Sequence, residues 1–216
     1  MTELYLIRHG ITAANLEHRM QGKTDQPLCG QGLAQLPYLQ AHFQSIRVDA
    51  VYCSPFRRAV QTAEVIAASH SLPLNMADDL RERDAGEQEG QRVRDMLQTC
   101  GLDVSSGGPR YPIRFDFPTA EPVAEVYSRM KHALGQILDA CRDQSVVIVS
   151  HGMAIQMAIA YLTGTALTAY VSHPLQNLSV SKALVDPHNH AEFQYYGDLS
   201  FLPDVLSSYN YAIGRQ

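Results

Sequence analysis

The chain has 216 residues, of which 45% are hydrophobic and 18% charged, a length that suits one globular domain with a large buried core. No apolar run approaches the ~18 residues of a membrane span, and Glu3 and Arg8 interrupt the N-terminus where a signal peptide needs an apolar core; we therefore expect a cytoplasmic protein with no membrane partner. The 17 basic and 22 acidic side chains give a net charge of −5 without a basic cluster, which argues against a nucleic-acid partner. The four cysteines are far apart, so we expect reduced thiols.

Three short apolar runs predict strands, at residues 4–7, 48–53 and 146–149. Apolar runs without polar alternation are typical of strands covered on both faces. Segments with helical character alternate with these runs, which favours an α/β fold with a mostly parallel sheet. Residues 179–185 and 192–196, separated by a polar turn, predict a hairpin at the sheet edge.

Turn and cap residues place several helices. Ser54 and Pro55 follow the second predicted strand as an N-cap and a first-turn proline, and the helix they begin is expected to run to about Ser69. A helix at 30–44 contains Pro37, which is expected to kink or shorten it. Further helices are predicted at residues 123–138 and 153–162.

Residues 101–118 have a different composition, with three glycines and three prolines and no clean period. A segment of this kind and length in a compact domain is commonly a functional loop. We expect a single domain over residues 1–216, with a cap or lid around 91–120.

Two histidines lie at the ends of predicted strands. Arg8-His9-Gly10 ends the first strand, and His151-Gly152 follows the strand at 146–149. Ligands of open parallel sheets bind beyond the carboxyl ends of the strands, and Arg58 reaches this edge from the first turn of a helix. The planar guanidinium of arginine can bind two phosphate oxygens at once, and a neutral imidazole is a competent nucleophile toward phosphorus. These residues predict a phosphoryl-transfer site.

Five groups of residues in order along the chain carry a family resemblance. They are Arg8-His9-Gly10-x-Thr12 with Asn15; Asp25-x-Pro27-Leu28 with Gly32 and Gln35; Ser54-Pro55-x-x-Arg58-Ala59-x-Gln61-Thr62-Ala63; Leu80-x-Glu82 with Gly86 and Glu89-Gly90; and Ser150-His151-Gly152. In order and spacing they resemble the motifs of the histidine phosphatase superfamily, phosphoglycerate mutase-like branch. The resemblance covers residues 4–177 and implies a three-layer α/β sandwich.

The resemblance also implies roles for the catalytic residues. His9 matches the histidine that becomes phosphorylated, and Arg8 and Arg58 match the arginines that bind the phosphoryl group. His151 matches the second histidine, which contacts that group during transfer. Glu82 matches the carboxylate that protonates the departing oxygen, with Asp84 as the alternative acid if the match is shifted, and with Glu89 expected to be structural.

Five further residues are candidates for substrate binding. Thr12 and Asn15 match positions on the phosphate side of the family's site, although helix capping explains them equally well. Gly152 opens a helix whose backbone N–H groups can bind an anion. Arg110 and Arg114 fall in the predicted cap, where they either contact the leaving group or face solvent.

The sequence departs from the family pattern at two places near the pocket. Gln88 stands where members usually carry a bulky aromatic residue, and Ala120-Glu121-Pro122 replaces the usual Gly-Glu-Ser. Neither change removes a catalytic group, but both alter the predicted floor of the substrate pocket, so the substrate of a relative is not assigned to this chain.

The preferred interpretation is a phosphomonoesterase that hydrolyses a small phosphate ester through a phosphohistidine, without a cofactor or metal. A phosphoglycerate mutase is the alternative enzyme, although the chain lacks room for the basic insertion that such mutases carry. A non-catalytic phosphoryl-binding protein is the alternative from another class, disfavoured because all four of His9, Arg58, Glu82 and His151 are present. A metal hydrolase is disfavoured because Arg8 and Arg58 would repel a divalent cation. The sequence is also compatible with a homodimer.

Overall fold

The computed structural model describes residues 1–99, 117–167 and 175–207. Its strands are β1 (Thr2–Arg8), β2 (Ala50–Cys53), β3 (Leu74–Met76), β4 (Ser145–Ser150), β5 (Val180–Val185) and β6 (Ala191–Asp198). Its helices are α1 (Ala13–Leu16), α2 (Gly30–Phe43), α3 (Arg57–Ser69), α4 (Val93–Thr99), α5 (Val123–Ala140), α6 (Gly152–Leu162) and α7 (Asp204–Ser207), with short 3₁₀ turns η1 (Asp78–Leu80) and η2 (Gly86–Gln88).

The strands form one sheet in the order β3-β2-β4-β1-β5-β6. The pairs β2 with β3, β2 with β4 and β1 with β4 are parallel, whereas β5 pairs with β1 and with β6 in antiparallel fashion. The mostly parallel sheet and the hairpin at its edge are therefore confirmed. The three predicted strands and the hairpin lie at their expected places, with ends that shift by one or two residues.

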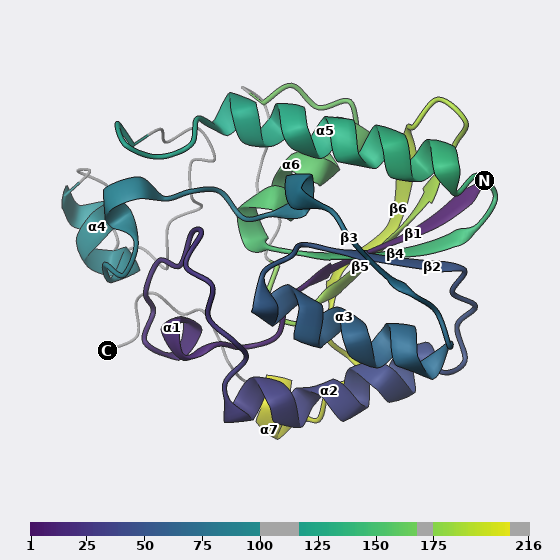
Figure 1. Ribbon diagram of the computed structural model, residues 1–216, viewed down its shortest axis with the longest axis horizontal. Coiled ribbons are helices and arrows are strands. Elements are labelled where there is room, and N and C mark those ends of the chain that lie inside the picture. Colours follow the sequence, from purple (N-terminus) through teal and green to yellow (C-terminus); the bar gives the residue numbers. More distant parts are fainter. Residues whose placement is uncertain (100–116, 168–174, 208–216) are drawn as a thin grey trace.

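Helices cover both faces of the sheet (Figure 1). Successive side chains of a buried strand point to opposite faces of the sheet, so each face has its own apolar core. Leu4 and Leu6 of β1 join the cluster that contains the apolar stripe of α5 and most of α6. Tyr5 and Ile7 join the cluster that contains the inner faces of α2 and α3. The predicted three-layer α/β sandwich is confirmed.

Two details of the helices differ from expectation. Helix α2 runs from Gly30 to Phe43 with Pro37 inside it, so the expected shortening was wrong. Pro37 has no backbone N–H, so the carbonyl of Leu33 has no donor within the helix. Both residues lie on the exposed side of α2, where water can bind that carbonyl. Helix α3 begins at Arg57 and not at Ser54, and its N-cap position is Phe56. The hydroxyl of Ser54 has another partner, in the site described below.

The predicted cap is described only in part. Its first residues form α4, and residues 100–116 lie outside the described part of the chain, as do Arg110 and Arg114. None of the described helices is long and apolar enough to cross a membrane.

Candidate active site

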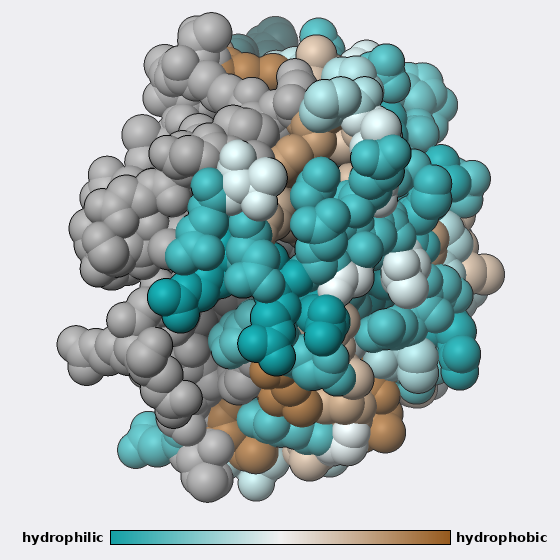
Figure 2. All heavy atoms as spheres, turned by 90° about the vertical axis from the view of Figure 1, so that its left-hand side faces the viewer, coloured by the Kyte–Doolittle hydropathy of each residue, from teal (hydrophilic) through white to brown (hydrophobic). Residues whose placement is uncertain are grey.

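Three neighbouring strands end together at one edge of the sheet. Arg8 of β1 is level with Ser150 of β4, which places His9 and His151 side by side, one residue beyond the two strands. Ser54 follows the end of β2 and donates its backbone N–H to the carbonyl of Val149 in β4. Hydrophilic side chains fill most of the described surface on this side of the molecule (Figure 2).

The imidazole of His9 is held as a neutral ring with a defined tautomer. Its Nδ1 lies 2.7 Å from the carbonyl oxygen of Gly10. Because a carbonyl can only accept, Nδ1 carries the proton and the lone pair lies on Nε2. Burial, together with the positive charges of Arg58 and Arg8, holds the pKa of His9 well below the ordinary value for histidine. At neutral pH the ring is uncharged, and Nε2 has the lone pair that a nucleophile needs.

The ring of His151 lies 5.1 Å from that of His9, measured between centroids. Its Nδ1 accepts a hydrogen bond of 3.2 Å from Arg58 Nε, so its Nε2 is the protonated nitrogen and donates to Ser54 Oγ at 2.7 Å. Burial and the charge of Arg58 hold the pKa of His151 well below the ordinary value. Since both ring nitrogens have protein partners, a contact between His151 and a phosphoryl oxygen requires one partner to be exchanged.

Arg58 is a fully buried cation whose partners are neutral groups. Its Nη1 donates to the carbonyl of Thr24 at 2.7 Å, and its Nη2 donates to that of Gly22 at 3.0 Å. Burial lowers its pKa to about 10, so it remains charged at neutral pH. Within the described residues no carboxylate forms an ion pair with it; Glu82 and Asp25 act on it only from longer range. A buried guanidinium without a contacting counter-charge favours binding of an anion.

The loop that supplies these carbonyls is fastened by Glu89. One oxygen of Glu89 accepts from the backbone N–H of Lys23 at 2.7 Å, and the other accepts from the hydroxyl of Thr24 at 2.5 Å. Gly22 has a φ of +51°, and a Cβ there would lie 2.3 Å from Glu89 Oε1. Glu89 therefore has the structural role that the sequence indicates, and it acts on the loop that positions Arg58.

Arg8 and Glu82 meet at the start of α6. A Cβ built on Gly152 would lie 3.7 Å from Arg8 Cζ and 3.7 Å from Glu82 Oε2. Arg8 Nη1 donates to the carbonyl of Leu175 at 2.7 Å, which anchors the guanidinium. A Cβ at position 152 would make ordinary van der Waals contacts with both groups, so the guanidinium of Arg8 and the carboxyl group of Glu82 both lie beside the first residue of α6.

Glu82 accepts three backbone hydrogen bonds, two of them from α6. Its Oε1 accepts from Arg83 at 2.9 Å and Ala154 at 3.2 Å, and its Oε2 accepts from Met153 at 3.2 Å. A carboxyl group at a helix N-terminus satisfies N–H groups that have no partner within the helix. Glu82 therefore lies at the N-terminus of α6 and binds the backbone N–H groups of Met153 and Ala154 there.

Asp84, the alternative acid, is poorly suited to that role. Its Oδ2 lies 2.7 Å from Lys23 Nζ, and its Oδ1 accepts from the backbone of Gly86 at 2.8 Å. The hydrogen bond from Lys23 lowers the pKa of Asp84, so this carboxyl group stays ionised at neutral pH. The geometry favours Glu82.

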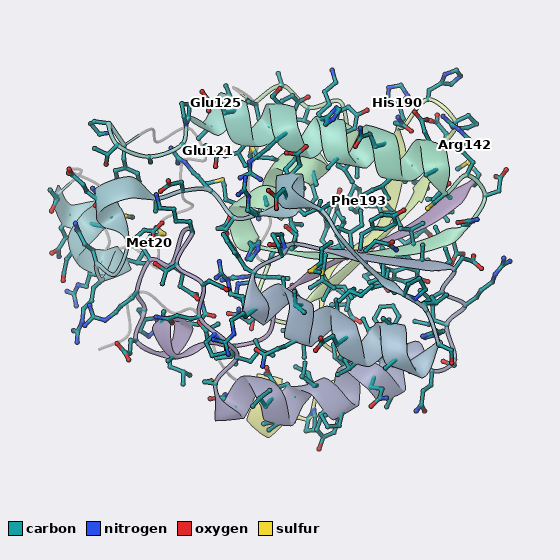
Figure 3. The ribbon with its side chains drawn as sticks, viewed as in Figure 1. Met20, Glu121, Glu125, Arg142, His190 and Phe193 are labelled. Atoms are coloured by element: carbon teal, nitrogen blue, oxygen red, sulfur yellow. The ribbon has the colours of Figure 1, made fainter. Side chains whose placement is uncertain are left out.

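The segment that carries Glu82 is clamped to α5 by an ion pair. Arg129 of α5 binds both oxygens of Glu121, at 2.7 and 2.9 Å, and the two side chains are only 14% and 18% exposed. The remaining nitrogen of Arg129 donates to the carbonyls of Asp79 and Arg81, at 2.8 and 2.6 Å. Glu121 lies just before α5, beside the segment that joins η1 to α4 (Figure 3). The pair fixes the backbone on the N-terminal side of Glu82.

Thr12 and Asn15 form a capping box at α1. Thr12 Oγ1 accepts from the backbone of Asn15 at 3.3 Å, and Asn15 Oδ1 accepts from the backbone of Thr12 at 3.1 Å. Both side chains are buried. Helix capping accounts for this pair in the structure, and a contact between either residue and substrate stays a prediction.

Three positioning residues were missed by sequence reasoning. The sequence predicts Ser54 as a helix cap, but its hydroxyl contacts His151, and the hydroxyl of Thr62 accepts from the backbone N–H of Gly10 at 3.0 Å. Asn177 precedes β5, far along the chain, yet its Nδ2 donates to the carbonyl of His9 at 3.0 Å. Ser54 and Thr62 belong to the Ser-Pro and Gln-Thr parts of a family motif, which could have indicated a role near the site. No local pattern in the sequence indicates a role for Asn177.

Across residues 1–99, 117–167 and 175–207, no three His, Cys, Asp or Glu side chains are grouped so as to hold a metal ion. His188 and His190 lie in the turn between β5 and β6, where His190 contacts Asp186 at 3.8 Å.

Comparison with known proteins places the chain in a family. The model of the histidine phosphatase superfamily (branch 1) matches residues 4–198. A Bacillus subtilis protein named "Uncharacterized phosphatase PhoE" is 33% identical over 164 residues, 76% of this chain and 79% of its own. A Proteus mirabilis protein named "Probable phosphoglycerate mutase GpmB" is 28% identical over 214 residues, 95% of this chain and 97% of its own. The solved structure of Bacillus stearothermophilus YhfR, 29% identical, superposes with a TM-score of 0.80 and covers 93% of this chain and 99% of its own. The chain belongs to the histidine phosphatase superfamily.

Proposed function

We propose that this protein is a phosphomonoesterase that hydrolyses a small phosphorylated metabolite through a phosphohistidine at His9. One observation carries the proposal: two buried, neutral histidines lie side by side at the strand ends, next to Arg58, a buried cation without an ion-pair partner among the described residues. A neutral nucleophile next to an unpaired cation suits attack on a phosphate dianion.

The reaction follows from the tautomer of His9 and the place of Glu82. In the first step the lone pair of His9 Nε2 attacks phosphorus, the bond to the leaving oxygen breaks, and protonated Glu82 gives that oxygen its proton. Arg8 and Arg58 offset the charge on the equatorial oxygens, and the carbonyl of Gly10 accepts from the Nδ1–H of the phosphorylated ring. In the second step water attacks phosphorus, the P–N bond breaks, and the Glu82 carboxylate takes the proton from water. Neither step requires a metal or an organic cofactor for its balance.

A phosphoglycerate mutase is the second candidate, because a relative carries that name. A mutase must hold a bisphosphorylated intermediate, which calls for several fixed cations beyond the phosphoryl pocket. Arg92 and Arg94, at the start of the predicted cap, are exposed, and the chain lacks the basic insertion of the longer mutases. These observations favour water as the phosphoryl acceptor.

The test is a panel of phosphate esters assayed for released phosphate. It includes sugar phosphates, nucleotides, phosphoserine and an aryl phosphate, and runs beside an assay of 3-phosphoglycerate to 2-phosphoglycerate conversion with and without 2,3-bisphosphoglycerate. Phosphate release faster than isomer conversion supports the phosphatase. Isomer conversion that outpaces phosphate release would identify a mutase, and no turnover in either assay would favour a phosphoryl-binding protein.

A further inference from the structure

The amide of Asn177 has one orientation available to it. Its Nδ2 faces three oxygen acceptors, the carbonyls of His9 at 3.0 Å and Gly10 at 3.2 Å and the Oδ1 of Asn15 at 3.1 Å. Turning the amide over would place its oxygen against these three acceptors and lose all three bonds, and would gain only a long contact of 3.5 Å with His9 Nδ1. The Nδ2 group is therefore the one that faces the catalytic histidine, and Oδ1 points away from it.

The contact with Gly10 bears directly on His9. The carbonyl of Gly10 accepts two hydrogen bonds, from His9 Nδ1 and from Asn177 Nδ2. The first bond fixes the proton of the imidazole on Nδ1, and the second holds the carbonyl that fixes it. Asn177 thus acts on the tautomer of His9 through a shared acceptor.

The other end of the amide faces a small cavity. Asn177 Oδ1 is buried without a hydrogen-bond partner in the described part of the chain, and so is Gln35 Oε1. Gln35 Nε2 donates to the carbonyl of Leu206 at 2.9 Å, so Oε1 is the oxygen left over. Both side chains line the cavity, whose other walls include Ile11, Leu199 and Leu202.

The size and polarity of this cavity suit one water molecule. The volume open to the centre of a water is about 10 Å³, near the minimum of roughly 10–15 Å³ that one water needs. A buried amide oxygen without a hydrogen-bond partner destabilises the fold, and a water that donates to both oxygens removes that cost. A cation is disfavoured because both acceptors are neutral.

We propose that Asn177 is a positioning residue for His9, and that one buried water shared with Gln35 completes its hydrogen bonds. The chain of contacts runs from the Leu206 carbonyl through Gln35, the water and Asn177 to the Gly10 carbonyl and the ring of His9. This inference rests on the proposed function, because it takes His9 Nε2 as the nucleophile. The tautomer of His9, however, is measurable without any turnover.

The first experiment compares wild type with Asn177→Leu, which keeps the volume and removes the amide. Histidine-selective ¹⁵N NMR should show the Nδ1–H form of His9 in wild type and a rise of the Nε2–H form in the variant. With an aryl phosphate, kcat should fall about 10- to 100-fold while KM changes little, because the ring is misplaced but the cations remain. Gln61→Leu is the matched control: it removes a half-buried amide whose oxygen accepts from the backbone N–H of Leu28 and which forms no hydrogen bond with His9 or Gly10 in the described part of the chain.

A second variant guards against loss of folding. Gln35→Met removes one end of the water bridge and leaves Asn177 in place, so its kcat should fall less than that of Asn177→Leu. A high-resolution crystal structure of the wild type should show one ordered water within hydrogen-bonding distance of both oxygens.

The outcomes separate the two proposals. An active wild type whose Asn177→Leu variant keeps both tautomer and kcat would overturn the positioning role of Asn177 and leave the phosphatase intact. A shifted tautomer in a chain without phosphatase activity would support the positioning of the ring and refute the proposed function. A dry cavity, or one of the two oxygens bonded elsewhere, would overturn the shared water.

Discussion

Replacing Arg129 tests whether the clamp between α5 and the Glu82 segment matters. Arg129→Met removes four hydrogen bonds and leaves the carboxylate of Glu121, 18% exposed, with the backbone N–H of Asp84 as its remaining partner in the described residues. Exposed pairs contribute about 0–1 kcal/mol, whereas breaking a fully buried pair costs about 3–5 kcal/mol. For this half-buried pair we expect a loss of about 2–3 kcal/mol.

For a chain of this length such a loss lowers Tm by about 5–10 °C. Arg142→Met is the control, because Arg142 lies at the far end of α5 (Figure 3) and pairs there with the exposed Asp139. That variant should unfold within about 2 °C of wild type. Thermal unfolding followed by circular dichroism measures both.

The same variant should affect catalysis selectively. Because Arg129 holds the carbonyl of Arg81, next to Glu82, its loss should lower kcat for an alkyl phosphate about tenfold and for an aryl phosphate less. In the double variant Arg129→Met/Glu121→Gln the unpaired charge is gone, so its loss of stability should be smaller than the sum of the single losses. Additive losses, or an Arg129→Met variant as stable as Arg142→Met, would refute the reasoning.

Four further outcomes follow from the site. Glu82→Gln should lower kcat for an alkyl phosphate by about 10²–10⁴ and for an aryl phosphate far less, since an aryl oxide leaves without a proton; equal losses would contradict the acid role. Because burial and the charges of Arg58 and Arg8 lower the pKa of His9, ¹⁵N NMR should show its ring neutral at a pH where free histidine in the same sample is half protonated, and titration in step with free histidine would argue against that environment. Because the pKa values of His9 and His151 are lowered by folding, acidification protonates these two rings in the unfolded chain before it protonates them in the folded chain. The free energy of unfolding should therefore fall below about pH 6.5, by about 1.4 kcal/mol per pH unit for each ring, with a smaller slope in His9→Gln; greater stability on acidification would contradict this. A chelator should leave activity unchanged and vanadate should inhibit, whereas activity lost to a chelator and restored by metal would favour a metal hydrolase.

The parts of the site predicted from the sequence are those that strand ends define. Arg8-His9-Gly10 and His151-Gly152 each follow an apolar run, and parallel strands bring their carboxyl ends to one edge. Helix periodicity likewise predicts α5, because its apolar stripe faces the core. Such features depend on local patterns along the chain.

The parts that were missed depend on contacts between distant segments. Ser54 has the local signature of a helix cap, yet its hydroxyl bonds to a ring almost a hundred residues away in the sequence. Pro37 predicts a kinked or shortened helix, but its position on the exposed side of α2 lets water satisfy the carbonyl that it leaves unbonded. Asn177 has no local signal, since its role arises only when β5 lies next to β1.

The most direct test of the account is to trap the phosphorylated enzyme. A substrate labelled with ³²P in the phosphoryl group is mixed with excess enzyme, quenched within milliseconds to seconds, and the labelled protein is digested and mapped. The account predicts a label that is stable in alkali and lost in acid, carried by the peptide that contains His9 and absent from His9→Ala, which should also lose turnover. Turnover without labelled protein, a label on another residue, or a His9→Ala variant that retains its activity would contradict the central claim that His9 is the phosphoryl acceptor.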